Sequence, residues 1–271
     1  MAMNAYRNYN TNNSALAKNL EKLSSGYRIN RAGDDAAGLA ISEKMRADIS
    51  IYSQSINNAN DGISMVQTAE GALTEVHSML NRMETLATQA ANGTYDTTTT
   101  TGDTTKIKAE IDALATEIDR IAKTTKFNGI TLLNGGVSKD IVVGQDVTND
   151  KVTISVATAM TSAGLGINGV AANIATGGAT AQGEIATIKT AIGTVSNVRS
   201  ALGAVQNRLE HTVNNLGVTM ENLQNAESTI RDTNVADEMM KYTKNNILIQ
   251  SAQAMLAQAN QVPQGVLQLM Q

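Results

Sequence analysis

A seven-residue spacing of apolar side chains, found near both ends of the chain, is the feature that most constrains its fold. The first series alternates steps of four and three, and the second repeats every seven residues. They are Met45, Ile49, Tyr52, Ile56, Ala59, Ile63 and Val66, then Leu202, Leu209, Leu216, Leu223 and Ile230. This spacing puts the apolar residues on one stripe of a helix and predicts left-handed coiled-coil packing. We call these two series the seam, which needs a partner helix to bury it.

The seam and its continuations predict four helical segments. The first stripe extends to residue 87 and predicts a helix over about 36–91. A shorter stripe predicts a helix over about 104–123 that folds back on the first. The last series predicts a helix over about 184–230, and a final helical tract begins near residue 234. Its proline, Pro263, should kink the helix or mark a restart.

The middle of the chain changes period. Residues 141–143 and 152–156 are typical of two short strands, with 144–151 as their hairpin loop, while 157–183 are rich in Gly, Ala and Thr and look irregular. The fold class we predict is mainly α: a long antiparallel helical coiled-coil bundle with a small β-hairpin insert within about 128–183.

Composition excludes several classes of protein. One Phe, six Tyr and no Trp favour thin helix-on-helix seams over a thick globular core, and the absence of Cys excludes disulfides and thiol chemistry. A net charge of −4 argues against nucleic-acid binding. The uncharged tract 245–271 is interrupted by recurrent Gln, so we expect it to lie against other helices and not in a membrane.

Few residues suggest site chemistry. Gly164 to Gly169 reads G-x-G-x-x-G, but no strand–helix unit surrounds it, so a flexible loop is the better interpretation. His77 and His211 lie on expected helices outside any metal-binding motif. Thr97 to Thr101 favour a loop over a patch that accepts glycans. We therefore expect no enzyme, no cofactor and no metal site.

Both ends of the chain resemble bacterial flagellins, over about 1–135 and 184–271. The segments 23–30, 34–41, 231–239 and 260–267 carry the resemblance. The residues we single out as filament-assembly motifs are Leu23, Ser24, Ser25, Gly26, Arg28, Arg31, Asp34, Asp35, Gly38, Arg231, Asp232, Glu238, Met239 and Pro263. Asp34 and Asp35 also precede the first seam helix, where acidic side chains favour a helix N-terminus.

Three departures from the family pattern are visible. Flagellins usually carry several more residues before the segment that matches 2–7. Asn234 stands where many members have Asp. Residues 136–183 leave no room for the large outer domains of long flagellins.

The resemblance implies a structural subunit that polymerises into the flagellar filament for swimming, with a hook–filament junction protein as the alternative. It implies an inner terminal domain from 1–35 and 232–271, which orders on polymerisation, and a rod domain from 36–231. It also implies an extracellular location reached without a cleaved signal peptide. The partners it implies are other copies of the chain, an export chaperone, and cap and hook-associated proteins.

The resemblance further suggests an animal receptor. Arg82, Leu86, Gln89 and Glu110 match the motif by which recognised flagellins bind Toll-like receptor 5, although Glu84 and Thr85 depart from it. Residues 82, 86 and 89 follow four- and three-residue steps, which place them on one helical face. A contact with the next subunit is the alternative use of this face.

Overall fold

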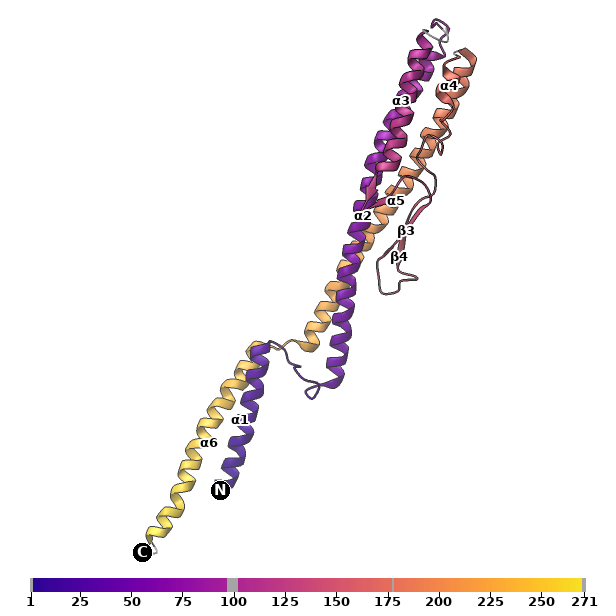
Figure 1. Cartoon of the computed structure of the whole chain (residues 1–271). Helices are drawn as coiled ribbons and strands as arrows, with labels where there is room; N and C mark the ends of the chain where they lie inside the picture. The colour runs from indigo at the N-terminus through magenta and orange to yellow at the C-terminus, as the bar shows by residue number, and fades with distance from the viewer. Residues whose placement is uncertain (1, 97–101, 177, 270–271) are drawn as a thin grey trace. The chain divides into compact units, whose positions relative to one another are not determined.

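The computed structural model describes residues 2–96, 102–176 and 178–269, and it is mainly helical (Figure 1). The helices are α1 (Ala2–Ser25), α2 (Ala36–Ala90), α3 (Asp103–Thr124), α4 (Val170–Ile174), α5 (Gly178–Arg231) and α6 (Val235–Leu269). The strands are β1 (Lys126–Phe127), β2 (Ile130–Thr131), β3 (Val137–Val142) and β4 (Lys151–Val156). The predicted fold class is confirmed. The Thr97–Thr101 run lies outside the described residues.

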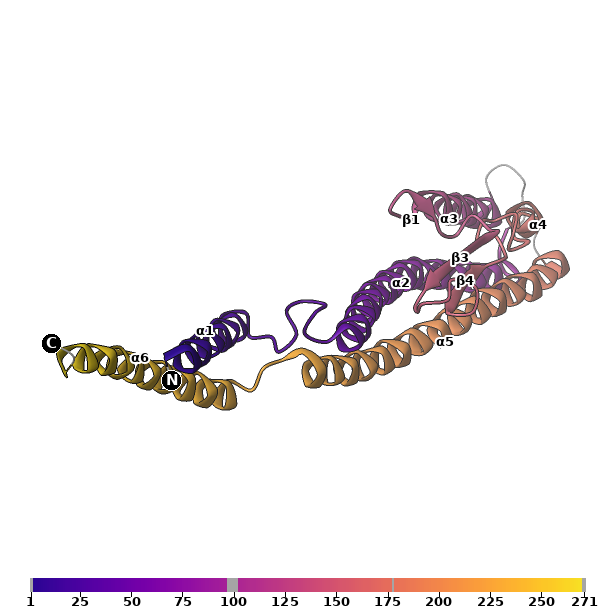
Figure 2. The ribbon, with the colours of Figure 1, turned by 90° about the horizontal axis from the view of Figure 1, so that it is seen from below.

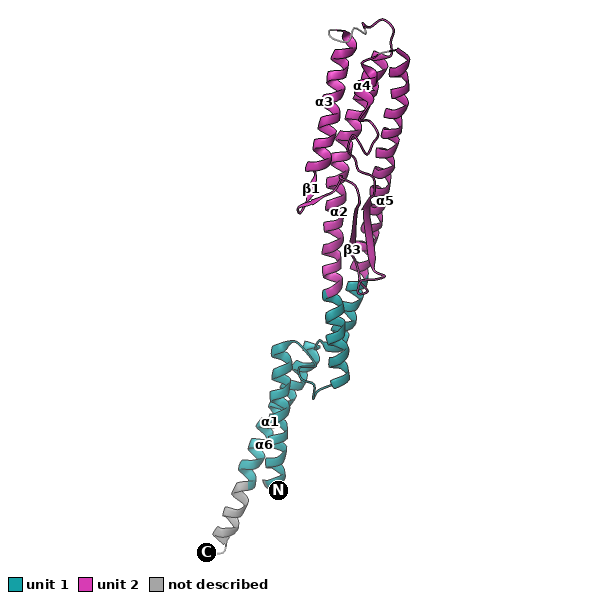
Figure 3. Cartoon of the chain, turned by 45° about the vertical axis from the view of Figure 1, so that its right-hand side comes forward, with its two compact units in different colours: residues 1–50, 219–271 teal, residues 51–218 magenta. Residues whose placement is uncertain are grey.

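The chain divides into two compact units (Figure 3). One contains residues 1–50 and 219–271, and the other contains residues 51–218. The helices α2 and α5 contribute to both units. We refer to them as the terminal unit and the central unit.

In the central unit, α2 and α5 pack antiparallel. The Nζ atom of Lys189 lies 3.7 Å from Glu84 Oε1, and Arg199 Nη2 lies 3.5 Å from Glu70 Oε1. Residue numbers on α2 therefore decrease as those on α5 increase, so the two helices run antiparallel. Between the charged edges lies an apolar core to which α3 also contributes. Its fully buried members include Leu73, Val76, Leu80, Met83, Ile111, Ile118, Ile188, Val195 and Leu209.

The hairpin β3–β4 covers part of this core (Figure 2). Its register runs from Val137 opposite Val156 to Val142 opposite Lys151, and the apolar residues of β4 are buried in alternation. The first strand starts four residues before the expected position 141. Three of the four residues missed, 138–140, are polar and exposed, so they carry no apolar signal although their backbones pair with β4.

Residues 157–183 are more ordered than predicted, since they contain α4 and the start of α5. The backbone amide and hydroxyl of Ser162 donate to Asp119 on α3, over 2.6 and 3.0 Å, and Ile167 is buried. A side chain at Gly164 would approach the Ala159 carbonyl oxygen to 2.1 Å, and Gly166 has φ +73°. The G-x-G-x-x-G segment is thus part of a packed turn that needs glycines.

In the terminal unit, α1 packs on α6 (Figure 1). The helix α6 passes through Pro263 and continues to Leu269. The restart we allowed for at this proline is therefore not seen. A proline removes one backbone N–H from the hydrogen-bond ladder, which strains a helix but does not have to end it.

Candidate assembly site

The two connectors of the terminal unit, residues 26–35 and 232–234, are joined by backbone hydrogen bonds. Arg28 N donates to Arg231 O over 2.6 Å, and Thr233 N donates to Gly26 O over 2.9 Å. Tyr27 and Asp232 form an antiparallel bridge between these bonds. Gly26, at φ +76°, provides the left-handed residue that ends α1. The connectors thus form one short junction at which all four terminal-unit helices end or begin.

Arg231 lies at the centre of this junction. Its guanidinium carbon is 4.8 Å from the centre of the Tyr27 ring, and its Nη1 donates to Glu43 Oε1 over 2.6 Å. The side chain is 13% exposed, so the guanidinium is largely removed from water. The hydrogen bond from Arg231 lowers the pKa of Glu43 below its ordinary value, with further contributions from Arg46. Arg231 therefore ties the last turn of α5 to the first turns of α2.

The acidic pair of the first motif shapes the connector and caps α2. Asp34 Oδ2 accepts hydrogen bonds from the backbone amides of Arg31 and Asn30, at 3.2 and 3.3 Å, and these bonds lower the pKa of Asp34. Asp35 Oδ1 accepts from Gly38 N over 2.9 Å, which caps the helix. A Cβ at Gly38 would approach Asp35 Oδ2 to 2.5 Å and the buried Ile29 to 2.8 Å. The spacing Asp35-x-x-Gly38 is therefore set by a helix cap.

The remaining motif residues have distinct positions. Ser25 Oγ accepts from Tyr27 N and Asn30 Nδ2, over 3.1 and 2.8 Å, and Arg31 pairs with Glu21 at 2.9 Å. Leu23 is half-buried and Ser24 is exposed on the last turn of α1. On α6, Glu238 is 5% exposed and Met239 is 47% exposed. The backbone of Pro263 is helical, and its side chain lies outside the described part of the chain.

Sequence reasoning did not single out three residues that complete the junction. Tyr27 and Ile29 lie inside the 23–30 segment, and Glu43 follows the 34–41 segment. Glu43 could have been found from an antiparallel pairing of the two seam helices, because that pairing brings the start of α2 near the end of α5. The stacking of Tyr27 on Arg231 had no signal in a single sequence.

The seam residues are buried to different degrees. Ala59, Val66, Leu202, Leu209 and Leu216 are buried, whereas the others are half-buried. The half-buried members in the central unit are Tyr52, Ile56 and Ile63, and those in the terminal unit are Met45, Ile49, Leu223 and Ile230.

The four residues of the receptor motif do not share one exposed surface. Arg82 Nε pairs with Glu110 Oε1 at 2.8 Å and links α2 to α3. Gln89 Nε2 donates to the hydroxyl of Tyr95 over 3.0 Å. Leu86 is 2% exposed and belongs to the core. The structure therefore presents three polar residues of the motif and buries its apolar one.

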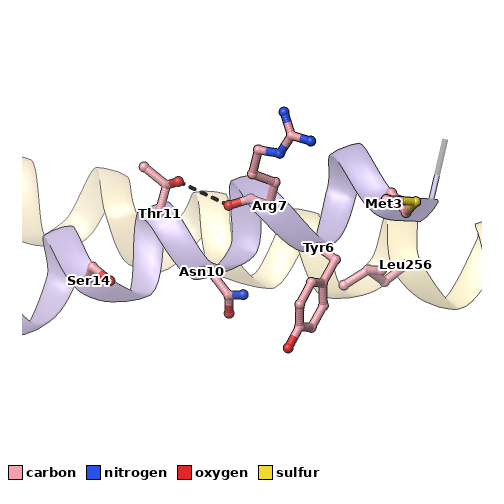
Figure 4. Close-up of a pocket in the computed structure, with 7 residues that line it drawn as sticks. All are labelled: Met3, Tyr6, Arg7, Asn10, Thr11, Ser14 and Leu256. Atoms are coloured by element: carbon pink, nitrogen blue, oxygen red, sulfur yellow. Dashed lines mark hydrogen bonds between the residues drawn. The ribbon is translucent and has the colours of Figure 1, made fainter.

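An open groove runs between α1 and α6. It has a volume of about 690 Å³ and is lined by Met3, Tyr6, Arg7, Asn10, Thr11, Ser14 and Leu256 (Figure 4). Met3 and Tyr6 are 79% and 60% exposed. The helix α6 adds further exposed apolar side chains, namely Val235, Met239, Met240, Ile247, Leu248 and Met255. The terminal unit thus exposes the kind of side chain that the central unit buries.

Other chemistry is sparse in the part of the chain that the structure describes. His77 on α2 is half-buried and His211 on α5 is exposed, and no cluster of three potential metal ligands is found among the described residues. Within the same ranges, no helix combines the length and apolar character needed to cross a bilayer. The described residues instead show helix caps, ion pairs and exposed apolar side chains on the terminal helices, which are features of helical subunits that associate.

Comparison with known proteins identifies the kind of subunit. Residues 1–138 match the bacterial flagellin N-terminal helical region, and residues 185–270 match the bacterial flagellin C-terminal helical region. The chain is 48% identical to flagellin from Bacillus subtilis (strain 168), with 99% of this chain and 97% of the relative covered. It is 50% identical to flagellin from Halalkalibacterium halodurans, with the same coverage. The chain belongs to the bacterial flagellin family, and it is a non-enzymatic component of the flagellar filament.

A solved structure shows a related fold. The putative flagellar hook-associated protein from Vibrio parahaemolyticus aligns with a TM-score of 0.61 over 73% of this chain and 100% of that chain. The two sequences are 13% identical, so the similarity concerns the fold alone. The near full-length identity to flagellins favours the filament subunit over the hook–filament junction alternative.

Proposed function

We propose that the terminal unit makes the contacts by which successive copies join the filament. In this proposal residues 1–35 and 232–271 form the inner terminal domain, and residues 36–231 form the rod. The observation that carries the proposal is the exposure of Met3, Tyr6, Met240, Ile247 and Met255 on α1 and α6, at 57–79%. Apolar surface in contact with water is unfavourable, and association with another copy buries it.

The symmetry of such contacts follows from their chemistry. The apolar residues of α6 and the α1–α6 groove are different surfaces of one chain, so contacts between them are head-to-tail. A head-to-tail contact that does not close into a ring gives a helical filament. The motifs at the junction would then hold the terminal helices in the orientation that this contact needs.

A matched pair of variants tests the proposal. Ile247→Asp places a charge on the exposed face of α6, and Val147→Asp places one on the exposed hairpin loop, where Val147 is 67% exposed. We expect Ile247→Asp to prevent polymerisation and Val147→Asp to leave it intact, as measured by sedimentation and electron microscopy of seeded samples. Normal filaments from Ile247→Asp would show that this face of α6 is not an assembly contact.

We also propose that the chain works outside the cell and that the flagellar export route carries it there. Before assembly, an export chaperone would cover the apolar face of α6, and cap and hook-associated proteins would meet the same terminal unit at the ends of the filament. Exposed Met and Ile residues on α6 support this, because flexible apolar side chains suit several partners.

Recognition by Toll-like receptor 5 is proposed for the monomer through Arg82, Gln89 and Glu110. These three side chains are exposed on α2 and α3, while Leu86 would support them from the core. A reporter-cell assay should show weaker signalling by Arg82→Ala monomer than by the parent. Equal signalling by the two proteins would leave contact between subunits as the role of this face.

A further inference from the structure

The interface between α1 and α6 buries polar side chains in place of apolar ones. Among the described side chains of these two helices, only Asn19 and Glu238 are buried, at 9% and 5% exposure. Leu20, next to Asn19, is 48% exposed, and Met239, next to Glu238, is 47% exposed. Apolar side chains of this pair, such as Leu16 and Ile249, are at most half-buried, so the buried side chains of its described part are polar.

The two buried residues belong to one hydrogen-bond network. With the Asn19 amide oriented to satisfy both its polar atoms, its nitrogen donates to Glu238 Oε1 over 2.8 Å and to Ala15 O over 3.1 Å. Its oxygen accepts from Asn245 Nδ2 over 3.0 Å. The second oxygen of Glu238 accepts from Lys241 Nζ over 3.0 Å. One residue of α1 is thereby bonded to two residues of α6 that are seven positions apart.

Such a network discriminates between registers more strongly than apolar contacts do. A Met or Leu that slides along a helix finds another apolar neighbour, but a buried carboxylate that loses its donors remains buried without a partner. Polar residues within helix interfaces fix register for this reason, at some expense of stability. A slip of seven residues would move α6 by about 10 Å along α1.

We propose that Asn19 and Glu238 set the register of the two terminal helices. By fixing which residues of α1 lie opposite which residues of α6, they determine where the exposed apolar side chains stand for the neighbouring copies. They are positioning residues, since they are themselves buried. The register claim stands on the network alone, and only its consequence for filament contacts rests on the proposed assembly surface.

The absence of cysteine from the chain makes a direct test possible, because introduced thiols are then the only ones present. Asn8 and Ala252 line the same cavity between α1 and α6, so Asn8→Cys with Ala252→Cys reports the native register. Ala15→Cys with Ala252→Cys reports a register displaced by seven residues. Each pair is treated with a short bismaleimide in the full-length chain, both free and polymerised.

Cross-linking in the parent chain and in two variants distinguishes an effect on register from an effect on stability. In the parent we expect cross-linking of the native pair only. In Asn19→Leu combined with Glu238→Leu, apolar residues of similar size keep the helices together, and we expect the displaced pair to cross-link as well. Glu238→Gln in the parent chain, which can still accept from Asn19, should keep the native preference. Circular dichroism monitors helix content in all three.

The outcomes are distinct. If the double Leu variant retains helix content and cross-links only the native pair, the register claim is overturned. Loss of both cross-links together with helix content would also overturn it, since the network would then serve stability alone. If register is lost while filaments form normally, the register claim stands and the proposed assembly surface fails.

Discussion

Replacement of Leu209 by Ala is the sharpest test of the antiparallel seam. Leu209 is fully buried on α5, and its Cδ1 lies 3.2 Å from the position that a Cβ on Gly62 of α2 would occupy. The leucine therefore packs against a helix backbone that offers no side chain of its own. A cavity next to a glycine has little to fill it, so we expect a loss of about 3–5 kcal/mol, the upper part of the range for buried Leu→Ala changes.

Urea titration followed by circular dichroism measures this loss. Val218→Ala, on the same helix at a position 60% exposed, is the matched control and should change the free energy of unfolding by less than about 0.5 kcal/mol. An unchanged slope with a lower midpoint would assign the effect to stability. A loss below about 0.5 kcal/mol for Leu209→Ala, the size of a surface change, would place Leu209 outside the core and refute the seam.

A double-mutant cycle tests the contact itself. Gly62→Ala alone should destabilise the chain, because its Cβ would lie 3.2 Å from both Leu209 and Ile141. In the Leu209→Ala background the same methyl group enters the space left by the leucine. We expect the double variant to lose less stability than the sum of the single variants, by about 0.5–3 kcal/mol. Additive losses would mean that the two residues do not share a cavity.

Three further predictions concern the rest of the chain. Removal of residues 245–271 should abolish polymerisation in sedimentation assays while the central unit keeps its helical melting transition; filaments from the truncated chain would contradict this. The lowered pKa of Glu43 means that its bond to Arg231 stabilises the fold above the ordinary carboxylate range and weakens as pH falls through the lowered pKa. Glu43→Gln should therefore reduce the acid sensitivity of thermal unfolding, and an unchanged pH profile would exclude this pair as its cause. Gly164→Ala should destabilise the packed turn because its Cβ meets a carbonyl oxygen, whereas Gly71→Ala on α2, with open space around it, should stabilise by about 0.5–1 kcal/mol; equal melting temperatures would refute the close approach.

The sequence was sufficient for features with a periodic apolar signal. The seam residues Leu202 and Leu209 follow from such a signal and are buried as the periodicity requires. The start of β3 was missed because Ser138 to Asp140 face solvent and carry no apolar pattern, although Asp140 accepts from Lys151 and Thr153 on the opposite strand. The first turns of α5 were missed because residues 178–183 contain two glycines and no large apolar side chain, so they show no apolar periodicity.

The sequence indicated which residues belong to the candidate site, but it did not indicate which of them contact one another. The resemblance selected Arg231 and Asp232, but the stacking of Arg231 on Tyr27 and its bond to Glu43 depend on residues about 190–200 positions apart in sequence. Glu238 was chosen as a motif residue without a partner. Asn19 was not chosen, because a polar residue on an amphipathic helix reads as surface until the opposite helix is in place.

The turn of the β3–β4 hairpin has a consequence for how this chain can change in length. Val143 N donates to Asp150 O over 2.9 Å, which closes the turn, and Gln145 to Asn149 between them are exposed. Residues added at this point would leave the six paired positions of the ladder intact. The entropy of closing a longer loop grows only with the logarithm of its length. A peptide grafted between Asp146 and Asn149 would therefore be displayed by a chain in which α1 still packs on α6.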